Sequence, residues 1–289
     1  MYDLLIAPFA DFGFMRRALA GVMSLSLGAG AVGVFLMLRR MSLVGDAMAH
    51  AILPGAAVGY LVAGLSLGWM TVGGLVAGMA VALLSGLVAR TTVLKEDASL
   101  AAFYLLSLAG GVTLVSLKGS NVDLLHVLFG SVLALDDPTL FLLAGTATAS
   151  MLALALLYRP LVLECVDPGY LRSVSDGSGA IAHLGFLALV VMNLVAGFHA
   201  LGTLLAVGLM MLPAIAARFW TDHVGGMIGW ATGFGLLSGT AGVLVSFHVG
   251  LPTGPTVILC AGAVYAFSIL FGAHGGLVIR ALPRRHLEA

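Results

Sequence analysis

From residue 41 to residue 89 the chain is built of apolar and small side chains and carries one formal charge, Asp46. A helix crosses a bilayer with about 20 apolar residues, so this run is long enough for two crossings. The whole chain has 61% apolar and 9% charged residues, whereas soluble domains carry about 25% charged residues. The sequence therefore predicts an integral membrane protein surrounded by lipid.

Charge-free runs at 99–117, 138–158, 177–217 and 223–279 extend the pattern. They predict an all-α polytopic membrane protein with about nine transmembrane helices, or eight if one is counted as partial. We expect these helices near 15–38, 44–66, 70–90, 99–117, 139–158, 180–197, 200–217, 225–247 and 255–273. The segment 121–135 is too short for an untilted crossing, and we interpret it as a short re-entrant helix.

The basic residues set the orientation of this topology. If segment 121–135 does not cross, most basic residues fall on one side: Arg39, Arg40, Arg90, Lys95, Arg159, Arg172, Arg218, Arg280, Arg284 and Arg285. Arg16, Arg17 and Lys118 fall on the other side. Because loops rich in Lys and Arg stay in the cytoplasm, the N-terminus is expected outside and the C-terminus inside.

Three regions follow from this reading. Residues 1–14 are expected to lie along the membrane surface, 15–280 to form one transmembrane domain, and 281–289 to be a cytoplasmic tail. The longest polar interruption, 159–179, predicts a cytoplasmic connection with a short helix between two bends. It is the natural docking site for a soluble partner, although an ordinary solvated loop has the same composition.

Asp46 and His50 lie four residues apart and therefore project from one face of a helix. Counted from Arg40 at about 1.5 Å per residue, His50 lies about 15 Å along, near the midplane of a core about 30 Å thick. Pro54 follows and frees a backbone carbonyl one turn earlier, as in the broken helices that line cavities.

In hydrocarbon such a pair costs several kcal/mol unless a partner, water or an ion meets it. We interpret Asp46 and His50 as a transfer site for a divalent metal, because this oxygen–nitrogen pair suits Zn²⁺, Mn²⁺ or Fe²⁺. The structural alternative has Asp46 capping the helix and His50 bonded to a neighbouring carbonyl. Weaker candidate ligands on the outer side are His126 with Asp123, and His199 at a turn. We expect His183, His223 and His274 to be ordinary interfacial residues near the inner surface.

Other functions find little support in the sequence. HExxH is absent, and the GxSxG match at 64–68 lies at a helix end without the strand-turn-helix context it needs, so no enzyme is expected. GxxxxGK[ST] is also absent, so ATP would have to be bound by another subunit. A net charge of +0 argues against nucleic acid as a partner. We expect no permanently bound cofactor, only a transported metal.

Five short motifs occur in order along the chain: Arg39-Arg40-Met41-Ser42 leading into Gly45-Asp46-Ala47 and His50, Leu128-Phe129-Gly130-Ser131, Asp167-Pro168, Gly202-Thr203-Leu204-Leu205 running to Leu212-Pro213-Ala214, and Pro252-x-Gly254-Pro255. Together they resemble the permease subunits of ABC-type zinc, manganese and iron importers, the ABC-3 family, and zinc-uptake permeases among them. The resemblance covers roughly residues 14–273.

The resemblance implies a type II ABC importer-like channel in a bacterial plasma membrane, homodimeric or sometimes heterodimeric. It implies two cytoplasmic ATPase subunits and an extracytoplasmic metal-binding protein as partners. It also implies that Asp46 and His50 hold metal in the pathway. The coupling element seated on the ATPase would be 159–179, with Glu164, Asp167, Pro168, Gly169 and Arg172.

Three positions depart from the family pattern. Gly169 stands where an acidic residue is frequent in the coupling loop, and Gly250 where Asp is frequent in an outer bend. His199 stands where Gln or Lys is more usual, and an added imidazole slightly favours Zn²⁺ over Mn²⁺.

We therefore expect the transmembrane permease subunit of an ATP-driven importer of Zn²⁺ or Mn²⁺, with Fe²⁺ also compatible. The alternative is a self-sufficient secondary metal transporter or channel, which would work in vesicles without ATP or a partner. A siderophore or cobalamin permease of the same architecture is a third option, and it would leave Asp46 and His50 idle.

Overall fold

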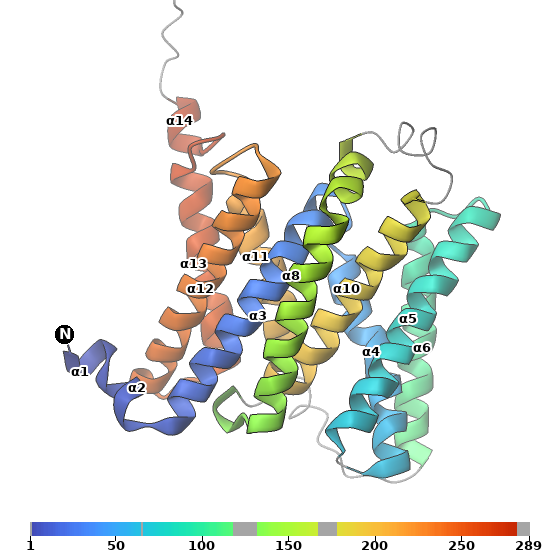
Figure 1. Cartoon of the computed structure of the whole chain (residues 1–289), viewed down its shortest axis with the longest axis horizontal. Helices are drawn as coiled ribbons and strands as arrows, with labels where there is room; N and C mark the ends of the chain where they lie inside the picture. Colours follow the sequence, from blue (N-terminus) through green and yellow to red (C-terminus); the bar gives the residue numbers. More distant parts are fainter. Residues whose placement is uncertain (1, 65, 118–131, 167–177, 282–289) are drawn as a thin grey trace, which may run out of the picture.

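The computed structural model describes residues 2–64, 66–117, 132–166 and 178–281, and every regular element in these ranges is helical (Figure 1). In chain order the elements are α1 (Tyr2–Leu5), α2 (Ala7–Asp11), α3 (Gly13–Leu38), α4 (Val44–Ala63), α5 (Leu67–Thr91), α6 (Glu96–Leu117), the 3₁₀ turn η1 (Val132–Ala134), α8 (Asp137–Val166), α10 (Ser178–Leu201), α11 (Thr203–Ala217), α12 (Val224–Val249), α13 (Thr253–Phe271) and α14 (Leu277–Ala281).

All nine predicted crossing helices are present. In the described part of the chain, 8 helices are long and apolar enough to cross a membrane, and α11 is a shorter apolar helix of 15 residues. The fold class predicted from the sequence is confirmed, with α11 as the partial member. Helix α4 ends at Ala63 rather than at 66, because Gly64 takes a φ of 66° that stops the helix.

The prediction that a loop begins at Arg159 is wrong. Helix α8 continues through Pro160 to Val166, although a proline inside a helix removes one backbone hydrogen bond and costs about 3 kcal/mol. Packing offsets that cost, since the next residue, Leu161, is 0% exposed. Glu164, expected in the loop, therefore lies in the last turn of α8.

Helix α6 ends and α8 begins on the same side of the bundle (Figure 1), which matches the predicted sidedness. Of the segment 121–135, only residues 132–135 are described, and they include the turn η1. The predicted re-entrant helix, with Asp123 and His126, lies outside the described residues and stays a prediction. At the same side of the bundle, α1 and α2 lie beside the start of α3 (Figure 1).

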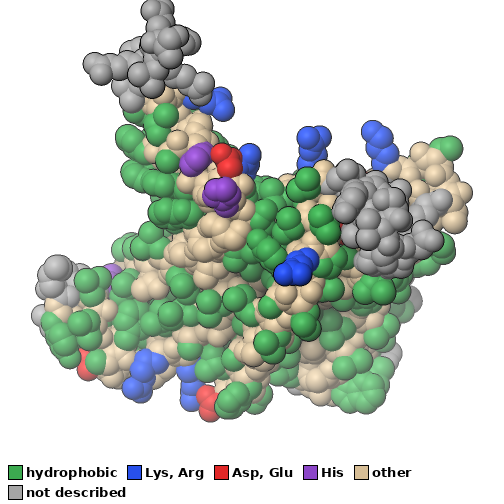
Figure 2. Space-filling model, turned by 45° about the horizontal axis from the view of Figure 1, so that its top comes forward, with side chains coloured by type: hydrophobic (Ala, Val, Ile, Leu, Met, Phe, Trp, Pro, Cys, Tyr) green, Lys and Arg blue, Asp and Glu red, His purple; other side chains and the backbone are tan. Residues whose placement is uncertain are grey.

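Most described basic residues gather at the other end of the bundle, which we call the basic end: Arg39, Arg40, Lys95, Arg159, Arg218 and Arg280. Figure 2 shows Lys and Arg side chains along this rim, a smaller group at the opposite edge, and mostly apolar side chains between them. The opposite end holds Arg16 and Arg17, with Arg17 Nε 3.1 Å from the Asp137 carboxylate. The sorting of these residues to two ends agrees with the predicted topology.

Helix α4 packs backbone to backbone against α5. A Cβ on Gly55 would lie 2.0 Å from the carbonyl oxygen of Gly73, and one on Gly59 would lie 2.3 Å from that of Trp69. Small residues four positions apart, such as Gly55 and Gly59, let two membrane helices approach this closely. On α6, a Cβ on Gly111 would lie 2.7 Å from Pro54, so this contact is also close.

We expect Gly111→Ala to lower the free energy of unfolding by about 1–3 kcal/mol, because the new Cβ would lie 2.7 Å from Pro54 Cβ and 2.8 Å from its Cα. Gly110→Ala is the matched control, since its Cβ would meet nothing within 4 Å in the described structure. Alanine is favoured over glycine in a helix by about 1 kcal/mol, so this control should be unchanged or stabilised. Thermal unfolding in one detergent measures both, and equal midpoints would contradict the close α4–α6 approach.

Candidate functional site

A tight turn joins α3 to α4 and sets the position of Asp46 and His50 on α4. Arg40 adopts a φ of 60°, which is uncommon for a residue with a side chain. The N–H of Arg40 donates to Met37 at 3.0 Å, and the N–H of Met41 donates to Leu36 at 2.9 Å. This pair of bonds closes α3 in a Schellman motif, so the chain reverses direction within a few residues.

Because of this turn, α4 begins at Val44, four residues after Arg40. The expected rise of about 15 Å to His50 assumed a helix from Arg40 and is wrong. His50 lies about 9 Å along α4 at 1.5 Å per residue. It therefore lies between the start of α4 at the basic end and the middle of this helix of 20 residues.

Asp46 and His50 lie side by side on α4, with Asp46 Oδ1 3.9 Å from His50 Nε2. That separation is too long for a hydrogen bond. The side chains are 69% exposed for Asp46 and 34% exposed for His50. Asp46 sits in the first turn of α4, where the helix dipole stabilises a carboxylate. Asp46 Oδ1 and His50 Nε2 are therefore neighbouring, partly exposed atoms that can donate electron pairs to a metal, and they are not hydrogen-bonded to each other.

The structural alternative for this pair finds no support in the described residues. The N-cap position of α4 is Leu43, which makes no side-chain capping bond. His50 Nδ1 is buried and has no hydrogen-bond partner within the described part of the chain, so the imidazole is not bonded to a neighbouring carbonyl there.

Helix α6 forms the wall beside His50. The rings of His50 and Tyr104 are stacked with centroids 6.3 Å apart, and the Ser107 hydroxyl donates to the Ala51 carbonyl at 3.1 Å. As the predicted helix 44–66 implies, α4 runs through Pro54, where Gly55 and Gly111 pack closely around it. Pro54 has no N–H, so the His50 carbonyl one turn earlier lacks its helical donor and adds an oxygen that can bind a cation.

A carboxylate and an imidazole can bind a divalent transition metal, but one chain supplies only part of a coordination shell. In the described ranges, no cluster of three or more His, Cys, Asp or Glu side chains could hold a metal ion. Protein-bound zinc usually has four ligands. A metal ion held by Asp46 and His50 would therefore need further ligands from outside the described part of this chain.

His199 is distant from this pair, in the last turn of α10 at the opposite end of the bundle (Figure 1). Its Nδ1 lies 2.8 Å from the Val195 carbonyl oxygen, and since a carbonyl only accepts, Nδ1 carries the proton. Its Nε2 is buried and has no partner within the described structure. His199 is thus a single candidate nitrogen, not brought together with Asp46 and His50.

Glu164 belongs to a buried ionic cluster that the sequence did not predict. Its carboxylate accepts a hydrogen bond from Arg39, and its Oε1 lies 3.9 Å from His183 Nδ1. Arg39 also reaches His183 Nδ1 at 3.4 Å. The expectation that His183 is an ordinary interfacial residue is wrong, because its side chain is 13% exposed. Arg39 is 125 positions from Glu164 and 144 from His183, so no local sequence signal could join it to them.

The other predicted coupling residues, Asp167, Pro168, Gly169 and Arg172, lie outside the described residues. They follow the end of α8 and precede the start of α10.

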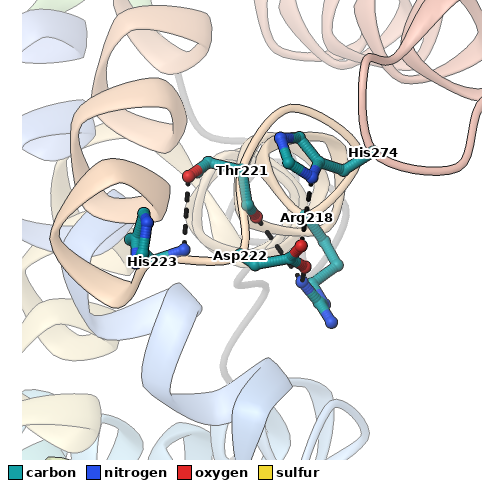
Figure 3. A network of polar contacts seen from close by, with 5 residues as sticks. All are labelled: Arg218, Thr221, Asp222, His223 and His274. Carbon is teal, nitrogen blue, oxygen red and sulfur yellow. Dashed lines mark hydrogen bonds and ion pairs between the residues drawn. The ribbon is translucent and has the colours of Figure 1, made fainter. Parts of the chain in front are cut away.

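A separate polar network lies exposed at the basic end, between the α11–α12 turn and the α13–α14 turn (Figure 3). Asp222 accepts from Arg218, and His274 Nδ1 donates to Asp222 Oδ2 at 3.0 Å. The hydrogen bond from Arg218 holds the pKa of Asp222 below its usual value, and His274 adds to this effect. The backbone N–H of His274 also donates to Phe219 at 2.7 Å. This network ties two surface turns together and lies apart from Asp46 and His50.

Comparisons with known proteins agree on one group. The ABC 3 transport family matches residues 11–272. The chain is 30% identical over 271 residues to the manganese transport system membrane protein MntC of Halalkalibacterium halodurans, covering 93% of this chain and 91% of that protein. It is 28% identical to a probable iron transport system membrane protein of Haemophilus influenzae, covering 94% and 98%. A solved structure described as PsaBC from Streptococcus pneumoniae in complex with Fab has a TM-score of 0.84 at 26% identity, covering 97% of this chain and 99% of that one.

Because Asp46 is exposed and the Nδ1 of His50 has no described partner, we expect Asp46→Ala and His50→Ala to change stability by no more than about 0.5 kcal/mol. Arg39→Ala should instead cost about 3–5 kcal/mol, since it leaves the buried Glu164 carboxylate unpaired. Thermal unfolding of the metal-free proteins measures the difference. If Asp46→Ala lowered the free energy of unfolding as much as Arg39→Ala, the role of Asp46 would be structural.

Proposed function

Because the chain belongs to the ABC-3 transport family, as a permease of the metal ABC importers and a multi-pass protein of a bacterial plasma membrane, we propose that it passes Mn²⁺ or a related divalent ion inward through Asp46 and His50. The open geometry of this pair is the observation that carries the proposal. Its two donors are exposed on a crossing helix and do not bond each other.

The exposed pair supports a second copy of the chain as partner. An ionised side chain on a crossing helix has to face a partner, water or an ion, and Asp46 is 69% exposed in the first turn of α4, so the face of α4 that carries it needs a covering surface. A two-fold axis beside this face would bring a second Asp46 and His50 opposite the first. Four protein donors then surround one ion, which is the usual number for zinc and a partial shell for manganese.

The choice of metal rests on the donors and on the relatives. Carboxylate oxygen suits Mn²⁺, whereas imidazole binds several transition metals. Relatives that cover most of this chain are named for manganese transport, and another is named for iron. We therefore place Mn²⁺ first and Fe²⁺ second. Zn²⁺ would gain rank only if His199 lies on the pathway, because a further imidazole suits zinc.

The proposed partners follow from what the chain lacks and from its family. The sequence contains no GxxxxGK[ST], so a separate cytoplasmic ATPase would supply ATP hydrolysis, and an extracytoplasmic metal-binding protein would deliver the ion. Metal affinity at the pair would have to be modest, since the ion must leave again. A self-sufficient secondary transporter has no particular observation in its favour.

We expect Asp46→Ala and His50→Ala each to abolish ATP-dependent ⁵⁴Mn uptake by proteoliposomes that contain the permease, its ATPase and its binding protein. The matched control is Asp222→Asn, which removes a carboxylate at the basic end without touching α4, and it should retain uptake. Parallel assays with ⁶⁵Zn and competing Fe²⁺ rank the metals. Uptake that persists without ATP would favour the secondary transporter, and full uptake by both alanine variants would exclude the pair as the transfer site.

Lowering the pH from 7 to 5 should weaken Mn²⁺ binding and uptake, because an imidazole must be deprotonated to ligate a metal. Binding is measured on the purified permease by titration with Mn²⁺ alone, and the His50→Ala variant should lose this pH dependence along with most of the affinity. Binding that does not change between pH 5 and 7 would count against His50 as a ligand.

A further inference from the structure

The cluster of Arg39, Glu164 and His183 joins three helices at the basic end. Arg39 caps the end of α3, Glu164 lies in the last turn of α8, and His183 lies near the start of α10. The Arg39 side chain is 6% exposed and that of Glu164 is 19% exposed. By contrast, the ion pairs Arg17–Asp137 and Arg218–Asp222 are about half exposed or more on both sides. The cluster is thus an enclosed ionic contact between separate helices.

Arg39 is held from several directions. Besides its bonds to Glu164 and His183, the guanidinium carbon lies 4.6 Å from the ring centroid of Phe186. Phe186 itself is 0% exposed. A guanidinium stacked over an aromatic face and paired to a carboxylate has a fixed orientation, so a shift of Glu164 or Phe186 must shift Arg39 as well.

The position of Glu164 is costly for α8 on its own. An acidic residue in the last turn opposes the helix dipole, and burying an unpaired carboxylate costs several kcal/mol. Both costs are offset only while Arg39 stays in contact. Pro160 lies four residues earlier and weakens the helix there by removing one backbone hydrogen bond. The end of α8 after Pro160 is therefore held by α3 as well as by its own helix.

The backbone then links Arg39 to Asp46 and His50 through one short turn. The Schellman bonds from Arg40 and Met41 close α3, and the Val44 N–H donates to the Met41 carbonyl at 3.0 Å. Asp46 follows in the first turn of α4. Because hydrogen bonds from Arg40, Met41 and Val44 brace this short turn, a movement of Arg39 is passed to α4 rather than absorbed in a loose loop.

We propose that Arg39, Glu164 and His183 are positioning residues that form an ionic joint, through which displacement of the basic ends of α8 and α10 moves the helix that carries Asp46 and His50. This inference rests on the proposed function, in which an ATPase acts at the basic end. The joint binds no metal and hydrolyses nothing. It sets how much metal is moved for each ATP hydrolysed.

The decisive variant is Glu164→Gln, which keeps the shape and an acceptor but removes the charge, compared with Asp222→Asn as the matched control at an exposed pair. In proteoliposomes with the ATPase and binding protein, Glu164→Gln should hydrolyse ATP at a rate close to that of the wild type. Its ⁵⁴Mn uptake per ATP should fall about 5- to 100-fold, the range of a typical coupling free energy. Mn²⁺ binding to the purified permease should be unchanged.

Three outcomes would overturn the joint: unchanged uptake per ATP, a parallel loss of hydrolysis and uptake, or lost Mn²⁺ binding in Glu164→Gln. Failure of the proposed function is distinct, because the wild-type complex itself would then show no ATP-dependent uptake. If Glu164→Gln does not fold, Arg39→Lys replaces it, since lysine keeps the charge but cannot make the forked, stacked contact.

Distances give a second readout that does not depend on activity. Leu43 and Val166 are 83% and 78% exposed, and they lie at the turn before α4 and at the end of α8. Spin labels at these positions, in a chain with Cys165→Ser and Cys260→Ser and diluted with unlabelled protein, report the spacing within one chain. The joint predicts the same narrow distance with and without ATP in the wild type and a broadened one in Glu164→Gln. A wild-type distance that changes with ATP would contradict it.

Discussion

Ionisable side chains in a bilayer must meet a counter-charge, water or an ion, and this constraint accounts for both polar features of α3 and α4. Arg39 and Glu164 satisfy it internally, with side chains 6% and 19% exposed. Asp46 and His50 leave it unsatisfied, with 69% and 34% of their side chains exposed. The buried Arg39–Glu164 pair can hold helices together, whereas the exposed Asp46–His50 pair is the one that a ligand could reach.

Arg39 and Asp46 lie on either side of one turn, which keeps the two pairs close together along the chain. Arg40 with its φ of 60° reverses the chain so that α4 starts at once. Asp46 then falls at the start of a helix, where the dipole favours its charge, and Arg39 faces back toward α8 and α10. A looser connection would still allow a metal site, but it would separate that site from the helices that flank the predicted coupling segment.

Much of this arrangement could be predicted from the sequence, because a bilayer imposes lengths and spacings that a single segment reveals. The nine helices follow from apolar run length, and Asp46 with His50 follows from a separation of four residues. The end of α8 could not be predicted, since the propensity of Pro160 is outweighed by contacts of Leu161 and Glu164 that the local sequence does not show. The Arg39 cluster could not be predicted for the same reason: Arg39 is more than a hundred positions from both Glu164 and His183 and meets them only through packing.

The close contacts of α4 give the open pair a rigid base. Gly55 and Gly59 bring α4 against the backbone of α5, while Pro54 meets Gly111 of α6 and Ala51 accepts from Ser107. A helix held on these sides resists local bending, so in the proposed transport cycle access to Asp46 and His50 would change by movement of α4 together with α5 and α6. Such a rigid-body change needs a fixed attachment at one end of the group, and the bonds around Arg39 provide that attachment at the end from which α4 begins.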